Sequence, residues 1–326
     1  MVGEITFAQQ FGFLSQGSDI DGMMGAIEGM LSYAAICGQM PELHPFLLGN
    51  PLFPILLPQM EKWNQTLVFT LKALNNRTKI SRDGELELDN SQAAGGDMLS
   101  RLAAVKSLDP LKMSTTDVVV ALAGNVFAGS DTTAIALRAI LYFLMKHPDK
   151  MHRLQTEIDN AADAGKISKP ISDKEARALP YLNAVIKEAL RLHSSVGLLL
   201  ERHVPAAGVT LCGKYIPGGT IVGINPWALQ HDPAVYPKPH VFDPERWLEA
   251  PPEHLAAMDR SFFAFGGGNR VCIGKNISYI EMRKIIPELV REFDISLPEG
   301  VEWKVKNMWF TQQSMPKCMV KRRTGM

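Results

Sequence analysis

The sequence has few cysteines and no excess of charge of either sign. Its 326 residues include only four cysteines (Cys37, Cys212, Cys272 and Cys318), without the density of a disulfide framework or the paired spacing of a zinc site. Lysine plus arginine equals aspartate plus glutamate at 34 each, so no charge excess points to nucleic acid as a partner. We therefore expect a reducing compartment, in which any important cysteine acts alone.

No leader or membrane anchor is predicted either. The first ten residues include Glu4 and lack the basic and apolar regions of a signal peptide. The long apolar stretch from Val118 to Met145 carries Asp131 and Arg138, and charges near the middle of a span are costly in lipid. We expect a buried helix of a soluble core here. The absence of an anchor indicates a cytoplasmic location for this chain.

The patterning predicts one domain over residues 1–326, mainly α with small β-sheets. The composition is 46% hydrophobic, which is ample for a large core, and no repeat, linker or low-complexity run divides the chain. Ser114 and Asp117 form a helix N-terminal pattern before the apolar stretch, which should end at the His147–Pro148 break. Further helices are expected at 59–78, 148–164, 180–193 and 274–293, short strands at 196–224 and 303–320, and a polar surface loop at 81–97.

The segment from Pro41 to Pro58 combines five prolines with many apolar residues. The prolines rule out a regular helix. The segment is either a loop packed on the core, which we favour, or a patch that makes peripheral contact with a membrane surface.

Residues that could bind a ligand or take part in catalysis are concentrated between Phe265 and Gly274. This segment has the sequence FGGGNRVCIG and leads into a predicted helix. Three consecutive glycines permit backbone conformations barred to other residues and a close approach to a flat ligand. Cys272 precedes a helix N-terminus, where backbone N–H groups favour a thiolate, and Arg270 offers a planar fork to an anion. A buried structural cysteine is the alternative. A phosphate-binding loop does not fit, because the lysine and the serine or threonine of a P-loop are missing.

This segment resembles, at every defined position, the haem-ligand motif of the cytochrome P450 family: phenylalanine, two glycines, a spaced arginine, cysteine and glycine. Three more segments resemble family motifs in the family's order. Ala128 to Thr133 is similar to its oxygen-activation helix, Glu188 to Arg191 to its Glu-x-x-Arg helix, and Pro244 to Trp247 to its Pro-Glu-Arg element. The resemblance runs along the whole chain, and its style is similar to fungal secondary-metabolism members.

The resemblance implies the cytochrome P450 fold and a bound haem b (iron protoporphyrin IX). Cys272 would be the axial ligand of the haem iron, within a cofactor-binding loop that includes Phe265, Arg270 and Gly274. Arg202 resembles the family's second propionate-binding arginine. A thiolate ligand favours O–O cleavage and thereby the attack of unactivated C–H bonds.

The other motifs receive roles from the same resemblance. Glu188 and Arg191 share one helix face, and Arg246 would complete a buried charge network that holds the cysteine loop; a solvated surface pair is the alternative. Thr132 would orient dioxygen and Asp131 would help to deliver protons, and a threonine there can bend its helix. The alternative for this pair is an ordinary helix irregularity.

The implied partners are a small apolar organic substrate and an NADPH-dependent cytochrome P450 reductase. Val196 to Leu200 and Val120 to Phe127 are apolar and should line the substrate pocket, although an ordinary core stripe would look the same. Electrons must come from outside, because the sequence contains no flavin or dinucleotide motif. The basic residues Lys275, Arg283 and Lys284 form either a docking patch for an acidic reductase or a solvated helix face.

Members of the family are considerably longer, so the resemblance implies that this chain lacks the N-terminal helices and part of the sheet. Full-length relatives are expected at the endoplasmic reticulum membrane surface. The expected function is that of a haem-thiolate monooxygenase. Two alternatives stay open, a haem-thiolate isomerase or dehydratase, against which Asp131 and Thr132 argue, and a catalytically inactive fragment.

Overall fold

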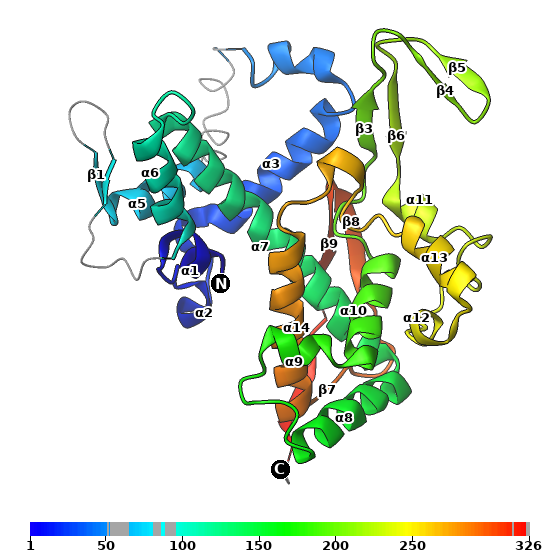
Figure 1. The fold of residues 1–326 in the computed structure, drawn as a ribbon. Coiled ribbons are helices and arrows are strands. Elements are labelled where there is room, and N and C mark those ends of the chain that lie inside the picture. The colour runs from blue at the N-terminus through cyan, green and yellow to red at the C-terminus, as the bar shows by residue number, and fades with distance from the viewer. Residues whose placement is uncertain (51, 53–64, 81–85, 89–95, 315, 324–326) are drawn as a thin grey trace. The chain divides into compact units, whose positions relative to one another are not determined.

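The structure is a computed structural model that describes residues 1–50, 52, 65–80, 86–88, 96–314 and 316–323 (Figure 1). The chain forms two compact units, residues 1–131 and residues 132–326. The boundary between them falls inside one long helix, α7 (Thr115–Lys146). Whether the chain is a single domain stays a prediction.

The described part of the first unit is mainly helical. Its core includes Phe7 and Leu74, which are fully buried, and the edge-on pair of Phe11 and Phe69, whose ring centroids lie 4.7 Å apart. Besides the first half of α7 it contains α1 (Val2–Phe7), α2 (Phe13–Gln16), η1 (Ile20–Gly22), α3 (Met23–Cys37), η2 (Pro41–Phe46), α5 (Gln65–Asn75), α6 (Met98–Leu108), β1 (Thr78–Ile80) and β2 (Leu86–Leu88).

The predictions for this unit have mixed outcomes. The Ser114 pattern is confirmed, because Asp117 N–H donates to Ser114 Oγ at 3.1 Å and Ser114 N–H donates to Asp117 Oδ2 at 2.8 Å. The polar loop expected at 81–97 is partly wrong, since residues 86–88 pair with β1 as an antiparallel strand and Asp97 caps α6. The helix expected from residue 59 is described from Gln65 onwards, and its earlier residues lie outside the described part.

Within the segment Pro41 to Pro58, the described residues do not pack as a core loop. Pro41 to Phe46 form the 3₁₀ turn η2, because proline disfavours a regular α-helix. The apolar side chains of this turn therefore do not form one continuous face. Phe46 is 73% exposed and Leu52 is 63% exposed, so the core interpretation is wrong for these two residues. The other residues from 51 to 58 lie outside the described part of the chain.

The second unit holds the expected helices at nearly the predicted bounds. Pro148 begins α8 directly after α7 ends, and Pro180 begins α10, in both cases at the first helical position, where proline lacks only an N–H that has no partner. The helices are α8 (Pro148–Asp163), α9 (Asp173–Arg177), α10 (Pro180–Leu192), α11 (Pro226–Gln230), α12 (Arg246–Glu249), α13 (Pro252–Arg260), the turn η4 (Gly268–Arg270) and α14 (Lys275–Glu292).

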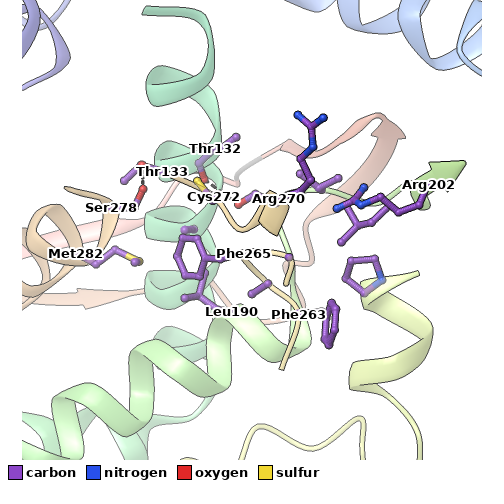
Figure 2. A pocket seen from close by; sticks show the side chains of 17 residues that line it. Thr132, Thr133, Leu190, Arg202, Phe263, Phe265, Arg270, Cys272, Ser278 and Met282 are labelled. Carbon is purple, nitrogen blue, oxygen red and sulfur yellow. Dashed lines mark hydrogen bonds between the residues drawn. The ribbon is translucent and has the colours of Figure 1, made fainter. Parts of the chain in front are cut away.

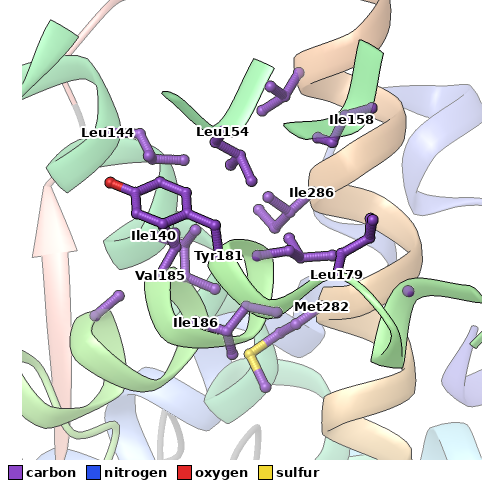
Figure 3. Close-up of a cluster of buried hydrophobic side chains, with 14 of the residues drawn as sticks. Ile140, Leu144, Leu154, Ile158, Leu179, Tyr181, Val185, Ile186, Met282 and Ile286 are labelled. Atoms are coloured by element: carbon purple, nitrogen blue, oxygen red, sulfur yellow. The ribbon is translucent and has the colours of Figure 1, made fainter. Parts of the chain in front are cut away.

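The core of this unit lies where α14 packs against α8, α9 and α10 (Figure 1). Apolar residues recur at helical spacing in α10, so that Leu182, Val185 and Ile186 are all fully buried. Figure 3 shows Val185 and Ile186 in one cluster with Met282 and Ile286 of α14 and with residues of α7 and α8. This cluster fixes α10, which carries Glu188 and Arg191, and α14, which follows the Cys272 loop.

The strands of the second unit form small antiparallel sheets, as predicted. Short strands separated by glycine and proline cannot build a wide sheet. Among the described residues the pairs are β3 (Leu200–His203) with β6 (Ile221–Ile224), β4 (Val209–Leu211) with β5 (Lys214–Ile216), β7 (Phe293–Ser296) with β10 (Met319–Arg322), and β8 (Lys304–Met308) with β9 (Phe310–Ser314).

Helix α7 is long and apolar enough to cross a membrane by length and composition, and no other helix in the described ranges is. Its C-terminal half contributes Ile140 and Leu144 to the core of the second unit, as expected for a core helix. Its N-terminal half buries Leu122 and Val126 but leaves Val120 63% exposed. The expected burial therefore holds for one face only in that half.

Candidate functional site

A cavity in the second unit brings together segments that are far apart in the sequence (Figure 2). Its walls come from α7, α10, the segment at 195–202 and the loop before α14, and most of them are apolar. This composition is typical of small-molecule sites, in which a few polar groups set the orientation. The lining residues are Thr132, Thr133, Ala136, Leu190, Ser195, Val196, Leu200, Arg202, Pro226, Phe263, Ala264, Phe265, Gly266, Arg270, Cys272, Ser278 and Met282.

The loop that bears Cys272 is shaped by its own main chain. Gly266 and Gly268 have φ values of +71° and +62°, a left-handed conformation that residues with a side chain rarely adopt. Cys272 N–H donates to the carbonyl of Phe265 at 2.9 Å and closes the loop. Cys272 is exposed and lines the cavity, so the alternative of a buried structural cysteine is wrong. Gly274 lies directly beside it, since a Cβ there would be 3.7 Å from the sulfur.

Two arginines reach the cavity from different elements. Arg270 ends the turn η4 inside the cysteine loop, and Arg202 lies on β3, where its Nη1 donates to the Glu201 carbonyl at 2.6 Å. Both arginines therefore line a cavity that Cys272 also lines. Planar donor groups of this kind suit carboxylates of a ligand.

The carboxylate of Glu188 is the centre of a buried polar network. Arg191 donates to both of its oxygens at 2.9 Å, and Arg246 Nε donates to Oε1 at 3.0 Å. Glu188 and Arg191 are fully buried and Arg246 is 8% exposed, so the alternative of a solvated surface pair is wrong. Trp247 Nε1 and the Asp243 N–H complete the set at 2.9 and 3.1 Å.

Arg191 and Arg246 extend this network into the loop segment that follows α11. Arg191 Nη1 donates to the carbonyls of Gln230 and Pro239, each at 2.7 Å, and Arg246 Nη1 donates to that of Pro237 at 2.9 Å. The role of Trp247 was missed in the sequence, although it directly follows the Pro-Glu-Arg motif. Its buried indole N–H needed an acceptor, which only the folded chain identifies.

Thr132 and Asp131 are neighbours on α7, and Thr132 lines the cavity, whereas Asp131 is not among its described lining residues. Helix α7 runs through this stretch without a break, and the bend stays a prediction. The Ser130 hydroxyl donates to the Val126 carbonyl, one turn back along the helix, at 2.7 Å. Ser195 Oγ donates to the Thr132 carbonyl at 2.8 Å.

A polar cluster that was missed in the sequence lies beside Thr132. The hydroxyls of Thr133 and Ser278 are 3.0 Å apart, and both residues line the cavity. Glu281, one turn further along α14, is 6% exposed, and burial raises the pKa of its carboxyl. The spacing of Ser278 and Glu281 places both residues on one face of a helix. The sequence does not show that Ser278 contacts Thr133 of α7, which only the folded chain reveals.

The predicted pocket lining and the predicted basic patch each divide into residues with different surroundings in the structure. Val196 and Leu200 line the cavity as expected, but no residue from Val120 to Phe127 is among its described lining residues. Of the three basic residues on α14, Lys275 is exposed, whereas Arg283 donates to Asn183 Oδ1 at 2.8 Å and lies 3.7 Å from Asp173. Arg283 is therefore engaged within the protein.

The sequence profile described as Cytochrome P450 matches residues 1–319. The chain belongs to the cytochrome P450 family. Its fold, mainly α with small antiparallel sheets, agrees with that membership. The cofactor of the family is haem, and its members act with a redox partner on an organic substrate.

Curated relatives of this P450 chain come from fungi. It is 39% identical to the cytochrome P450 monooxygenase cicH of Emericella nidulans, over 100% of this chain and 64% of the relative. It is 38% identical to a pisatin demethylase of Fusarium vanettenii, over 99% of this chain and 60% of the relative. A cytochrome P450 monooxygenase of Alternaria alternata is 34% identical over 99% of this chain and 85% of the relative. The chain thus spans about three fifths of the length of the first two.

Proposed function

We propose that this chain carries the haem-thiolate site of a monooxygenase that inserts one oxygen atom from O₂ into a small apolar organic substrate. The observation that carries the proposal is the exposed thiol of Cys272 at the wall of an apolar cavity, in a loop closed by its own backbone. When haem b is bound, a thiolate-ligated iron supplies oxidation of unactivated C–H bonds by O₂.

The residues around the cavity fit such a group. Cys272 would bind the iron through its sulfur, and Gly274 leaves the space beside that sulfur free of a side chain. Arg270 and Arg202 would bind the propionates, because their guanidinium groups reach the cavity from two elements. Phe265 would cover the cofactor with its ring. The donor set is one soft anionic ligand, two cations and apolar walls, which matches the chemistry of haem.

The polar residues of α7 would handle protons. The Thr132 hydroxyl, at the cavity wall, would hold a proton by hydrogen bonding near the reacting oxygen, and Asp131 would resupply it. In the Glu188 network, Arg191 and Arg246 would hold the segment between α11 and the cysteine loop in place. The apolar residues Val196 and Leu200 would orient a hydrophobic substrate and exclude water.

Electrons would come from an NADPH-dependent cytochrome P450 reductase. The support is the exposed surface next to the ligand, where Ile273 is fully exposed and Lys275 is exposed as well. Exposed Phe46 and Leu52 support peripheral contact of the Pro41 to Pro58 segment with the endoplasmic reticulum membrane surface.

The deciding experiment is the spectrum of the purified protein after addition of haem, reduction and exposure to carbon monoxide. A strongly red-shifted Soret band, abolished in Cys272→Ser and retained in Cys212→Ser, is the expected result. Cys212 is a matched control because it is also exposed but lies at the β4–β5 turn, away from the cavity. A band without the red shift, or one that survives in Cys272→Ser, contradicts the proposal.

The proton role of Thr132 is tested by the coupling of NADPH use to product. Thr132→Ala should increase the share of electrons lost as hydrogen peroxide, because the proton at the reacting oxygen is then poorly held. Thr116→Ala, on the exposed first turn of α7, is the control and should leave coupling unchanged. Equal coupling in the wild-type protein and Thr132→Ala would remove this role.

A further inference from the structure

The side chain of Gln230, the last residue of α11, is fully buried and hydrogen-bonded at both ends. Its Nε2 donates to Ser194 Oγ at 2.7 Å and to the carbonyls of Arg191 and Leu190 at 2.9 and 3.3 Å. Its Oε1 accepts the Phe263 N–H at 2.8 Å. A buried amide with both ends engaged has one orientation, because any other leaves polar groups without partners.

One end of this amide is tied to the charge network. The side chain of Gln230 binds the carbonyl of Arg191, and Arg191 Nη1 in turn donates to the carbonyl of Gln230 at 2.7 Å. Arg191 is itself fixed by the carboxylate of Glu188. The position of Gln230 therefore follows that of the network.

The other end of the amide reaches the cysteine loop. Phe263 and Gly266 form a turn in which Gly266 N–H donates to Phe263 O at 2.9 Å, and Phe265 O then accepts the Cys272 N–H at 2.9 Å. Phe263 also lines the cavity. In the ranges that the structure describes, no other side chain hydrogen-bonds to the main chain between Phe262 and Cys272.

We propose that Gln230 is the positioning residue through which the Glu188 network sets the loop that bears Cys272. Gln230 is not among the lining residues of the cavity, so it acts through Phe263 rather than on a ligand. The positioning of the loop is a property of the protein alone. Its consequence for iron ligation rests on the proposed function.

The first test is hydrogen exchange in the chain without haem. Gln230→Leu removes both ends of the bridge while keeping the side chain close in size. Exchange in peptides covering residues 263–272 should accelerate by about fivefold, because a net hydrogen bond is worth on the order of 1 kcal/mol. The matched control is Gln313→Leu, another buried amide, whose Nε2 donates to Ile135 O at 2.9 Å. The control should leave exchange in that loop unchanged.

A second variant separates the two ends and covers the case in which Gln230→Leu fails to fold. Gln230→Glu keeps an oxygen to accept the Phe263 N–H but replaces the Nε2 donor that faces Arg191 and Leu190. Exchange should then rise in peptides covering residues 190–194, and at residues 263–266 it should rise less than in Gln230→Leu, because the loop keeps its hydrogen bond but loses the tie to the network. Unchanged loop exchange in Gln230→Leu, or equal acceleration in Gln313→Leu, would overturn the positioning role.

The haem-loaded protein supplies an independent readout. At equal haem content, Gln230→Leu should shift part of the carbon monoxide band away from the thiolate position, whereas Gln313→Leu should not. A wild-type protein without the thiolate band would overturn the proposed function and leave exchange to decide the role of Gln230. A wild-type band with an unchanged Gln230→Leu band and unchanged loop exchange would overturn the role of Gln230 alone.

Discussion

The carboxylate of Glu188 and the thiol of Cys272 have opposite surroundings. Glu188 is fully buried, and its two oxygens accept five hydrogen bonds from Arg191, Arg246, Trp247 and the Asp243 N–H. Cys272 is exposed, and its loop is closed by main-chain hydrogen bonds such as that from Cys272 N–H to Phe265 O. A buried charge must be fully compensated, whereas a ligand group must stay accessible. We therefore infer that the rigid Glu188 network next to the Cys272 loop keeps this loop ordered.

The largest effect should come from breaking the buried region. Glu188→Ala leaves two arginines buried without their shared carboxylate, which should cost about 3–5 kcal/mol of stability. Because the network holds the segment next to the cysteine loop, haem incorporation should fall as well. Chemical unfolding and the ratio of haem to protein measure the two effects. Haem bound at normal stoichiometry in Glu188→Ala or Arg191→Ala would contradict the proposed role of the network.

Acid should weaken the same region by a smaller amount. His193 follows α10, is 1% exposed, and has its Nε2 3.0 Å from the Thr311 carbonyl, and burial lowers its pKa to about 4. The unfolded chain takes up this proton near pH 6.5, so stability should be complete above that pH and be lost as pH falls towards 4. The shift corresponds to about 3 kcal/mol.

Two histidine variants test whether His193 causes this loss of stability in acid. His193→Gln stays neutral at all pH values and should flatten the fall in unfolding free energy between pH 6.5 and 4. His152→Gln, on the exposed side of α8, is the control and should keep it. An unchanged pH profile in His193→Gln would show that other groups cause the fall.

A change within the loop itself should cost less. Gly266→Ala places a side chain at φ +71°, a strain of about 1–2 kcal/mol. This strain lies within the loop and leaves the Glu188 network intact, so hydrogen exchange should rise in the loop and not in α10. Gly124→Ala, in α7 with open space around the position, is the control and should stabilise by about 0.5–1 kcal/mol. Exchange that rises equally in α10 would show that loop and network unfold together.

The smallest effect should come from an ion pair with the same spacing as Glu188 and Arg191. Lys112 and Asp109 are also three residues apart, with Nζ and Oδ2 2.9 Å apart, but the lysine side chain is 81% exposed. Lys112→Ala should change stability by at most about 1 kcal/mol, because water screens exposed charges. Thermal unfolding of both variants together measures the contrast. A cost for Lys112→Ala close to that for Glu188→Ala would mean that burial does not set the difference.

Local sequence patterns correctly predicted several helix starts and the unusual backbone of the Cys272 loop. The prolines at 148 and 180 and the Ser114–Asp117 pair predicted helix starts that the structure confirms. The glycine-rich run predicted the unusual backbone before Cys272. The strand at 86–88 was missed, because its three residues lie within a polar segment and its pairing depends on β1. The role of Gln230 gave no local signal, since its partners lie about 40 and 33 residues away along the chain.

The sequence by itself determined the family, the bounds of α8, α10 and α14 to within a residue or two, and the residue types of the candidate site, because propensities, caps and motif spacing act over a few residues. Only the tertiary structure decided that Glu188 and Arg191 are buried, that Arg283 is engaged within the protein, and that Cys272 faces a cavity. Burial and hydrogen-bond partners depend on which distant segments pack together. Two opposite charges three residues apart can therefore form an exposed ion pair, as Asp109 and Lys112 do, or part of a buried network, as Glu188 and Arg191 do.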